Sequence, residues 1–399
     1  TKEEFFGYFN DGMGTTEAMR LHESKLSVKE DGPMLPANGA INPQARTVYY
    51  WHDLWRREHF GSSVDPVKKI QEKIPLYASH GIDVKVQTEE GTPWAVLVVT
   101  PIMRRMQEHN SACEVIFIDS TSSCDAGQST TTVLLAATKA GAIPIAVLIH
   151  NSQSTDGYCA AFGLLKASYP LCCGGLHTPA AFMTDNSSAE KAALRTTWPG
   201  ATQLLCHFHV AQAEWRWLTS KENGVDKKER RQLMSAFQEI LYADTAEKLA
   251  EAKQKLECVP HARYIERVQD FLEKEQEWVL LYRKSITTRG HNTNNFAEAC
   301  IHILKDIVLC RTRAFNAAGL VDFVAHVWEL YFQGRLLKHA NNRVAGHNLF
   351  YEKLLKKMPE ETTILTDGDG IYTVTSATDN AKTYEVLPGV GLCTCRAGG

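Results

Sequence analysis

Three acidic residues lie where a folded chain could gather them around divalent metal ions. Asp119 follows the apolar run Val115–Ile118, and Asp185 follows the run Ala181–Thr184. Glu298 lies early in a segment with helical spacing. Two aspartates at the carboxyl ends of buried strands, with a glutamate from a helix, can hold two ions that clamp the attacking and leaving oxygens of a phosphoryl transfer. These residue types in this order predict metal-dependent cutting of DNA.

Each acid also has a purely structural interpretation. A strand-end aspartate is often a turn or cap residue, and Asp125, six residues after Asp119, is an alternative carboxylate. We favour Asp119 because Asp125 lies in a predicted loop. Asp185 could cap the helix that follows it, although Ser187 already offers a capping hydroxyl. Glu298 could be an ordinary residue of a helix surface.

The acids require a sheet whose strands end at their positions. The sequence predicts the order β-β-β-α-β-α-β, with strands at 115–119, 131–138, 143–150, 180–185 and 202–206. Three consecutive strands imply antiparallel hairpins, and the later β-α-β steps imply parallel pairing. We therefore predict an α/β fold with a mixed five-stranded sheet and flanking helices. Its first and fourth strands can be neighbours, which would bring Asp119 beside Asp185.

Composition divides the chain into six segments. They are a flexible N-terminal arm (1–44), an N-terminal helical and hairpin region that is a candidate for DNA binding (45–110), the first part of the core (111–206), an all-helical insertion (207–285), the last part of the core with Glu298 (286–350), and a C-terminal hairpin segment (351–399). In the second segment, Tyr49, Tyr50, Trp51 and Trp55 could stack on bases, but their helical spacing favours a small hydrophobic core.

The composition excludes several classes of protein. With 44% apolar residues the chain is globular, and no run is long and apolar enough to span a membrane. Eleven scattered cysteines favour reduced thiols inside a cell, and the polar start shows no signal peptide. The start without Met favours a trimmed or excised chain. Walker, dinucleotide-glycine and Gly-x-Ser-x-Gly motifs are missing from the sequence, which weakens nucleotide-enzyme and hydrolase interpretations.

The net charge of −3 does not indicate a protein that binds nucleic acid. The charge is uneven, however, because residues 283–357 carry 12 Lys and Arg against 5 Asp and Glu. Such a basic segment around Glu298 could attract phosphate, and a solvated helical surface would give the same pattern.

Four short motifs, in their order and spacing, resemble the transposase domain of the Mutator-like element (MULE) family, part of the DDE, RNase H-like superfamily. The motifs are Phe117–Thr121, Phe182–Asp185, the Cys-x-x-His pair of Cys206 and His209, and Thr293–Glu298. The gap of 113 positions between the second acid and the third fits the helical insertion that these enzymes carry. The resemblance covers about residues 45–350.

This resemblance implies an RNase H-like fold and cut-and-paste DNA transposition by strand cleavage and strand transfer. Asp119, Asp185 and Glu298 would be the catalytic residues and the ligands of two Mg²⁺ or Mn²⁺ ions. The partners would be double-stranded DNA (transposon ends and target) and a second copy of the chain in a homodimer or larger synaptic complex. The location would be nuclear. Residues near the catalytic glutamate contact DNA in related enzymes, and the candidates here are His302, Lys305, Arg289 and Asn294.

Two rival functions share this fold. A domesticated transposase would act as a nuclear DNA- or protein-binding factor without catalysis. An RNase H-like nuclease would cut without joining strands. The three acids argue against the first rival, and joining of DNA ends would argue against the second.

Two pairs of residues are candidates for binding zinc. Cys206 and His209 supply only two of the four ligands of a structural zinc site, although the pair Cys172-Cys173 with His177 could approach them. We favour a packing and hydrogen-bonding role for the pair, and contact of His209 or His207 with DNA is an open alternative. Cys393 and Cys395 resemble the start of a SWIM zinc finger, Cys-x-Cys followed by Cys-x-His. The second pair does not follow, so Zn²⁺ would bind only if a full finger were present, and the finger is either lost or cut off.

Overall fold

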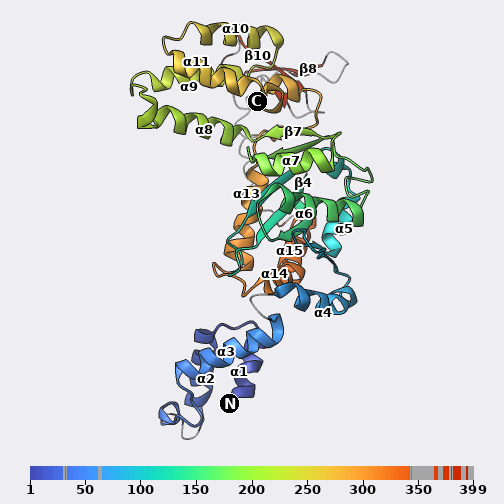
Figure 1. Cartoon of the computed structure of the whole chain (residues 1–399), viewed down its shortest axis with the longest axis vertical. Helices are drawn as coiled ribbons and strands as arrows, with labels where there is room; N and C mark the ends of the chain where they lie inside the picture. The colour runs from blue at the N-terminus through green and yellow to red at the C-terminus, as the bar shows by residue number, and fades with distance from the viewer. Residues whose placement is uncertain are drawn as a thin grey trace.

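The computed structural model describes residues 1–29, 32, 34–61, 65–341, 343, 364–366, 372–376, 379, 381–387 and 392–393. The molecule is elongated (Figure 1). Three N-terminal helices lie at one end, a mixed α/β core lies in the middle, and further helices and the C-terminal strands lie at the other end. Within the part of the chain that is described, no helix is long and apolar enough to cross a membrane.

The core is a seven-stranded mixed sheet in the order β1-β2-β5-β4-β3-β6-β7. The strands are β1 (Asp83–Gln87), β2 (Ala95–Val99), β3 (Val115–Thr121), β4 (Thr130–Thr138), β5 (Gly141–His150), β6 (Ala181–Thr184) and β7 (Thr202–Leu205). Strands β3, β4 and β5 pair antiparallel, whereas β3, β6 and β7 pair parallel. The predicted mixed sheet is confirmed and contains the five predicted strands, but it has seven strands in all, and the fold is consistent with an RNase H-like fold.

The hairpin of β1 and β2 was predicted, but its place in the core sheet was not. Strand β2 pairs antiparallel with β5, and all five of its residues are buried. A strand that is buried along its whole length has a continuous apolar sequence, and Ala95–Val99 has such a sequence. The hairpin therefore extends the core sheet.

Strand β5 contains a proline in its middle, which the fold accommodates with a bulge. The register between β4 and β5 shifts so that Leu135 pairs with Pro144 and Leu134 with Ala146, leaving Ile145 unpaired. Proline has no N–H for a sheet ladder, and an extra residue relieves the mismatch. The freed carbonyl oxygen of Ile145 accepts a hydrogen bond of 2.8 Å from the buried amide of Gln107.

Helices cover both faces of the sheet. Successive residues of a strand point to opposite faces, and β3 shows both contacts. Phe117 packs edge-on against Phe296, with ring centroids 5.3 Å apart, whereas Ser120 hydrogen-bonds to Tyr158. The helices of the core are α4 (Pro66–Ser79), α5 (Pro101–Gln107), α6 (Thr155–Ser168), α7 (Ser188–Thr197), α13 (Asn295–His302), α14 (Ala317–Asp322) and α15 (Glu329–Ala340), with the 3₁₀ turn η2 (Asn110–Cys113) and the π-helical turns η5 (Ile303–Val308) and η6 (Phe323–Trp328).

The helical insertion has its own hydrophobic core. It consists of α8 (His207–Thr219), α9 (Arg230–Leu241), α10 (Ala246–Glu257), α11 (Ala262–Leu272) and α12 (Glu275–Trp278), with the 3₁₀ turns η3 (Lys221–Asn223) and η4 (Leu280–Arg283). Trp278 is fully buried and stacks on Phe237 with ring centroids 5.2 Å apart. The helices of the insertion are therefore stabilised by a hydrophobic core of their own, separate from the core around the sheet.

The prediction of a flexible arm over residues 1–44 is wrong for residues 2–27. These residues form α1 (Lys2–Asn10) and α2 (Thr15–Ser27), which pack on α3 (Ala45–Phe60), with the turn η1 (Leu35–Ala37) between α2 and α3. Phe5 and Phe9 are buried there, and Trp51 and Trp55 pack against them. Scattered Gly and Pro suggested a linker, but the aromatic residues bury enough apolar surface to order the helices. The small-core interpretation thus fits both tryptophans.

The C-terminal segment forms a four-stranded antiparallel sheet of β8 (Ile364–Thr366), β9 (Tyr372–Thr375), β10 (Thr383–Leu387) and β11 (Leu392–Cys393). The predicted hairpin corresponds to β9 and β10. Cys393 lies in β11, and Cys395 lies outside the described residues. The SWIM finger stays a prediction.

Candidate active site

The two aspartates lie at matching positions of neighbouring parallel strands, just beyond the last residues that pair the two strands. The register pairs Phe117 of β3 with Met183 of β6. Asp119 and Asp185 each lie two residues further on, so both carboxyl groups are at the carboxyl end of this strand pair. The edge beyond the carboxyl ends of strands is where α/β sheets place their chemistry. The predicted neighbourhood of the two strands is confirmed.

Glu298 reaches the same edge because its helix is anchored there. Asn294 precedes α13, and its side-chain amide donates a hydrogen bond of 2.7 Å to the carbonyl oxygen of Ile118. The backbone N–H of Asn294 donates to Cys206 Sγ at 3.1 Å. These two bonds fix the start of α13 beside the end of β3 and the end of β7. Glu298 lies one turn into the helix from that point.

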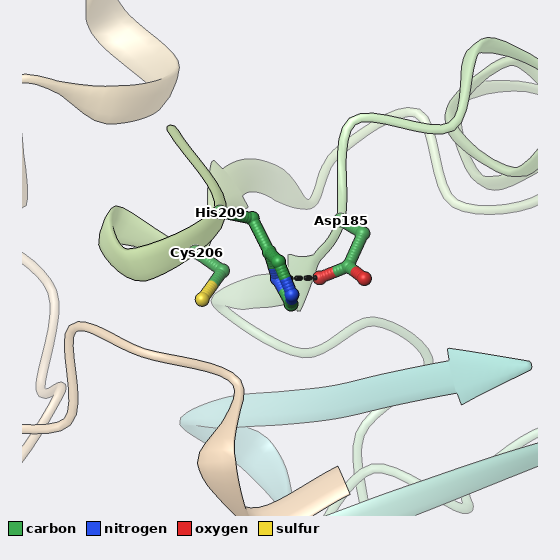
Figure 2. Close-up of side chains that lie close together, drawn as sticks. All are labelled: Asp185, Cys206 and His209. Carbon is green, nitrogen blue, oxygen red and sulfur yellow. Dashed lines mark ion pairs between the residues drawn. The ribbon is translucent and has the colours of Figure 1, made fainter. Parts of the chain in front are cut away.

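His209 lies between two of the three acids. Its Nδ1 is 2.6 Å from Asp185 Oδ1, and its Nε2 is 3.4 Å from Glu298 Oε1. Figure 2 shows the ring of His209 directed at Asp185, with the thiol of Cys206 nearby. Carboxyl groups that are 113 positions apart in the sequence therefore meet at one imidazole.

The charge of Asp119 responds to the other two acids. Burial is the largest cause that raises the pKa of Asp119, to about 6, and the charges of Asp185 and Glu298 raise it further. A hydrogen bond from the backbone of Ser120 and the charge of His209 oppose the rise. The three predicted acids thus form one electrostatic group.

The acids fit a site for divalent cations. Asp185 Oδ1, His209 Nδ1 and Glu298 Oε1 are buried and have no hydrogen bond of good geometry among the described residues, despite their short separations. Buried polar atoms are otherwise nearly always satisfied. Oxygen atoms of clustered carboxylates are the ligands that Mg²⁺ and Mn²⁺ prefer, and a cation would also offset their mutual repulsion. Asp119, Asp185 and Glu298 could supply these ligands.

The structure places a third candidate zinc ligand, Asp185, beside Cys206 and His209. Ligand atoms of Asp185, Cys206 and His209 lie within 4.8 Å of one another. However, Cys206 Sγ already accepts from the Asn294 N–H, and burial is the main cause that raises the pKa of its thiol. A neutral thiol is a poor metal ligand. The geometry therefore fits the predicted hydrogen-bonding role of Cys206.

The two cysteines considered as further zinc ligands, Cys172 and Cys173, lie elsewhere. The backbone N–H of Gly174, next to Cys173, donates to the carbonyl oxygen of Gln107. The hydrogen bond with Cys172 and burial are the main causes that raise the pKa of the Cys173 thiol, and Cys113 raises it further. Cys113 closes the turn before β3, at the strand end opposite Asp119. Cys172 and Cys173 therefore do not approach Cys206.

Asp125, the alternative carboxylate, has a structural role. It is fully buried, and its two oxygens accept from the backbone N–H of Ser129 at 2.7 Å and from the Ser129 hydroxyl at 2.8 Å. These bonds close the loop between β3 and β4. The choice of Asp119 over Asp125 agrees with this geometry.

The four candidates for DNA contact differ in exposure. The prediction for Asn294 is wrong for this conformation, because its side chain is fully buried. Arg289 makes two hydrogen bonds of 2.6 Å to Glu114 and keeps an exposed face. The side chain of His302 is 75% exposed, with Nδ1 3.1 Å from an oxygen of Asp306. For Lys305, in η5, as for Arg289 and His302, contact with DNA stays a prediction.

Two buried charged residues beside the site were not predicted. Arg283 is fully buried and joins β7, α12 and the loop before α13. Glu190 is 4% exposed in the first turn of α7. The sequence offers a weak signal for Glu190 in Ser187-x-x-Glu190, but that spacing is also typical of a helix cap.

Asp119 should make the stability of the metal-free protein depend on pH. Its pKa is raised from 3.8 to about 6 in the folded chain. Between these values the folded chain keeps a proton that the unfolded chain has released, so the free energy of unfolding falls as pH rises. Urea unfolding in EDTA, from pH 4 to pH 7, measures this slope. Asp119→Asn should flatten it, and an unchanged slope in that variant would contradict the assignment.

Comparison with known proteins agrees with this geometry. Residues 115–213 match the family model of the MULE transposase domain. The matched segment runs from the start of β3 into α8, and it includes Asp119, Asp185, Cys206 and His209. No curated protein matched the chain. The predicted resemblance is confirmed for this segment: from residue 115 to residue 213, the chain matches the MULE transposase domain.

Proposed function

We propose that the chain is a DDE-type DNA transposase that catalyses metal-dependent strand cleavage and strand transfer. The observation that carries this proposal is the convergence of Asp119, Asp185 and Glu298 at one sheet edge. Two of these acids lie inside the segment that matches a transposase domain. A transposase domain also implies DNA as a partner.

The residues of the site have separable roles in this proposal. The three carboxylates hold two Mg²⁺ or Mn²⁺ ions, which supply activation of a water or a DNA 3′-hydroxyl and stabilisation of the leaving oxygen. His209 keeps the Asp185 and Glu298 carboxyl groups together. Asn294 and Cys206 fix the start of the helix that bears Glu298.

The proposal extends to assembly and location. Cut-and-paste transposition brings two DNA ends together, so we propose a homodimer or larger complex on DNA. We also propose a nuclear location, because the target of such a reaction is chromosomal DNA.

An activity assay tests the proposed function. Purified protein is incubated with supercoiled plasmid and a duplex oligonucleotide that has a free 3′-hydroxyl end, in Mn²⁺ or in EDTA. We expect Mn²⁺-dependent nicking of the plasmid and covalent joining of the oligonucleotide to it. Nicking without joining would favour the nuclease.

A direct measurement of ion binding distinguishes the proposed transposase from a domesticated binding factor. Crystals soaked in Mn²⁺ should show anomalous density between Asp119, Asp185 and Glu298. Neither density nor nicking would be expected of a domesticated binding factor, and that pair of results would overturn the enzyme assignment.

A further inference from the structure

A fourth acidic side chain lies behind the site and has no role in the mechanism above. Glu190 is in the first turn of α7, five residues after Asp185. Only 4% of its surface is exposed. Glutamate is almost never buried to this extent unless it is paired.

Helix capping does not explain this burial. The Ser187 hydroxyl oxygen accepts from the backbone N–H of Glu190 at 3.4 Å, which is half of a capping box. The other half would be a hydrogen bond from the Ser187 N–H to the Glu190 carboxylate, and α7 does not make it. Instead, Glu190 Oε1 is buried without a hydrogen-bond partner among the described residues.

Among the described residues, no basic side chain forms an ion pair with Glu190 either. Its neighbour Lys191 pairs with Glu277 of α12. Burial is the largest cause that raises the pKa of Glu190, followed by the charges of Asp119 and Asp185. Glu190 thus lies close enough to the two aspartates for their charges to act on it. Burial is the main cause that raises the pKa of Tyr158 on α6, and the charge of Glu190 raises it further.

Without a cation, this arrangement is unfavourable. An unpaired buried carboxylate costs several kcal/mol in desolvation, and two like charges nearby increase that penalty. A glutamine would fit the same space without the charge. The presence of an acid at this position therefore calls for a positive partner.

Charge balance identifies that partner. Asp119, Asp185 and Glu298 carry three negative charges, whereas two divalent ions carry four positive charges. We propose that Glu190 is a fourth acidic group of the divalent-cation site, a positioning residue that balances the ions from behind Asp119 and Asp185. The inference rests on the proposed function, and it adds a residue outside the three predicted acids.

Binding of Mn²⁺ to the metal-free full chain, measured by calorimetry at pH 7.5, tests the proposal. Glu190→Gln should weaken Mn²⁺ binding about 10- to 100-fold, the range found when an outer partner of a metal site is removed. Glu190→Asp keeps the charge and should bind Mn²⁺ more tightly than Glu190→Gln. Equal affinity of wild type and Glu190→Gln would overturn the proposal.

The matched control is Glu329→Gln. Glu329 is also a buried glutamate, 7% exposed, with Oε2 unpartnered among the described residues, but it lies on α15 and accepts from the backbone N–H of Ile102 at 3.3 Å. We expect wild-type Mn²⁺ affinity in this control. If Glu329→Gln weakened Mn²⁺ binding as much as Glu190→Gln, the effect would be one of general structure, and the proposal would fall.

Thermal unfolding gives a second readout that a merely structural acid would not produce. In EDTA, Glu190→Gln should melt at a higher temperature than wild type, because it removes a buried carboxyl group whose Oε1 has no partner among the described residues. Saturating Mn²⁺ should raise its melting temperature less than that of wild type. A lower melting temperature of Glu190→Gln in EDTA would contradict the proposal.

Asp185→Asn keeps the two proposals distinguishable. If Asp185→Asn weakens Mn²⁺ binding and Glu190→Gln does not, only the role of Glu190 fails. If wild type itself binds no Mn²⁺, the proposed function and the role of Glu190 fail together.

Discussion

Asp185→Asn is expected to abolish Mn²⁺-dependent nicking and joining, with a loss of about three orders of magnitude or more in rate. Asparagine has the shape of aspartate but lacks the charge that holds a divalent ion. The Asp185 side chain is 40% exposed, so the exchange leaves the packing of β6 intact. Asp119→Asn and Glu298→Gln should have the same effect, because the three acids act as one group.

The control is an aspartate outside the site. Asp156 is exposed in the first turn of α6, and Asp156→Asn should keep wild-type activity. Circular dichroism and thermal unfolding in EDTA check that each variant is folded. Full activity in any one of the three acidic variants would remove that residue from the site.

Local sequence pattern was sufficient to predict Asp119 and Asp185. Each follows a short apolar run that is typical of a buried strand, and a parallel sheet aligns the ends of such strands. The chain order β-β-β-α-β-α-β limits the arrangement of these strands further. The fold and the meeting of the two aspartates therefore follow from features within about 20 residues of each acid.

The surroundings of the acids depend on contacts that no local pattern contains. Asn294 lies four residues before Glu298, a spacing that within one helix would place both side chains on the same face. In the structure Asn294 precedes the first residue of α13, where the helical periodicity does not apply, and its amide turns inward to Ile118. Periodicity predicts faces only within a helix, and the boundary of a helix is the least certain part of a prediction.

The burial of the charged residue Glu190 could not be predicted from local sequence either. A Ser-x-x-Glu spacing at a helix start predicts a capping carboxylate on the surface. Packing of α6 and α7 on the sheet buries it instead. Burial of this kind depends on the positions of three elements at once, so it becomes visible only when the sheet and both helices are in place.

Arg283→Met is expected to destabilise the folded chain by about 3 kcal/mol, because it leaves buried acceptors without a donor. The guanidinium is fully buried and donates to the backbone oxygens of Leu205, Asn292 and Glu277 and to Asn292 Oδ1. Each unsatisfied acceptor costs about 1–3 kcal/mol. Burial lowers the pKa of Arg283 to about 9, so removal of the charge offsets part of that loss.

The measurement is urea unfolding of the metal-free protein at pH 7.5. Arg195→Met is the matched control, because Arg195 pairs with the same Glu277 from an exposed position and should change stability by less than about 1 kcal/mol. Arg283→Lys keeps the charge but cannot reach all four acceptors from one ammonium, so its stability should fall between those of wild type and Arg283→Met.

The carbonyl oxygen of Asn292 also accepts a hydrogen bond of 2.9 Å from the backbone N–H of His207, which lies two residues before His209. Loss of Arg283 should therefore loosen the loop that leads to Glu298 and lower activity beyond the loss of stability. Wild-type stability in Arg283→Met would show that the insertion and the core are held together by other contacts.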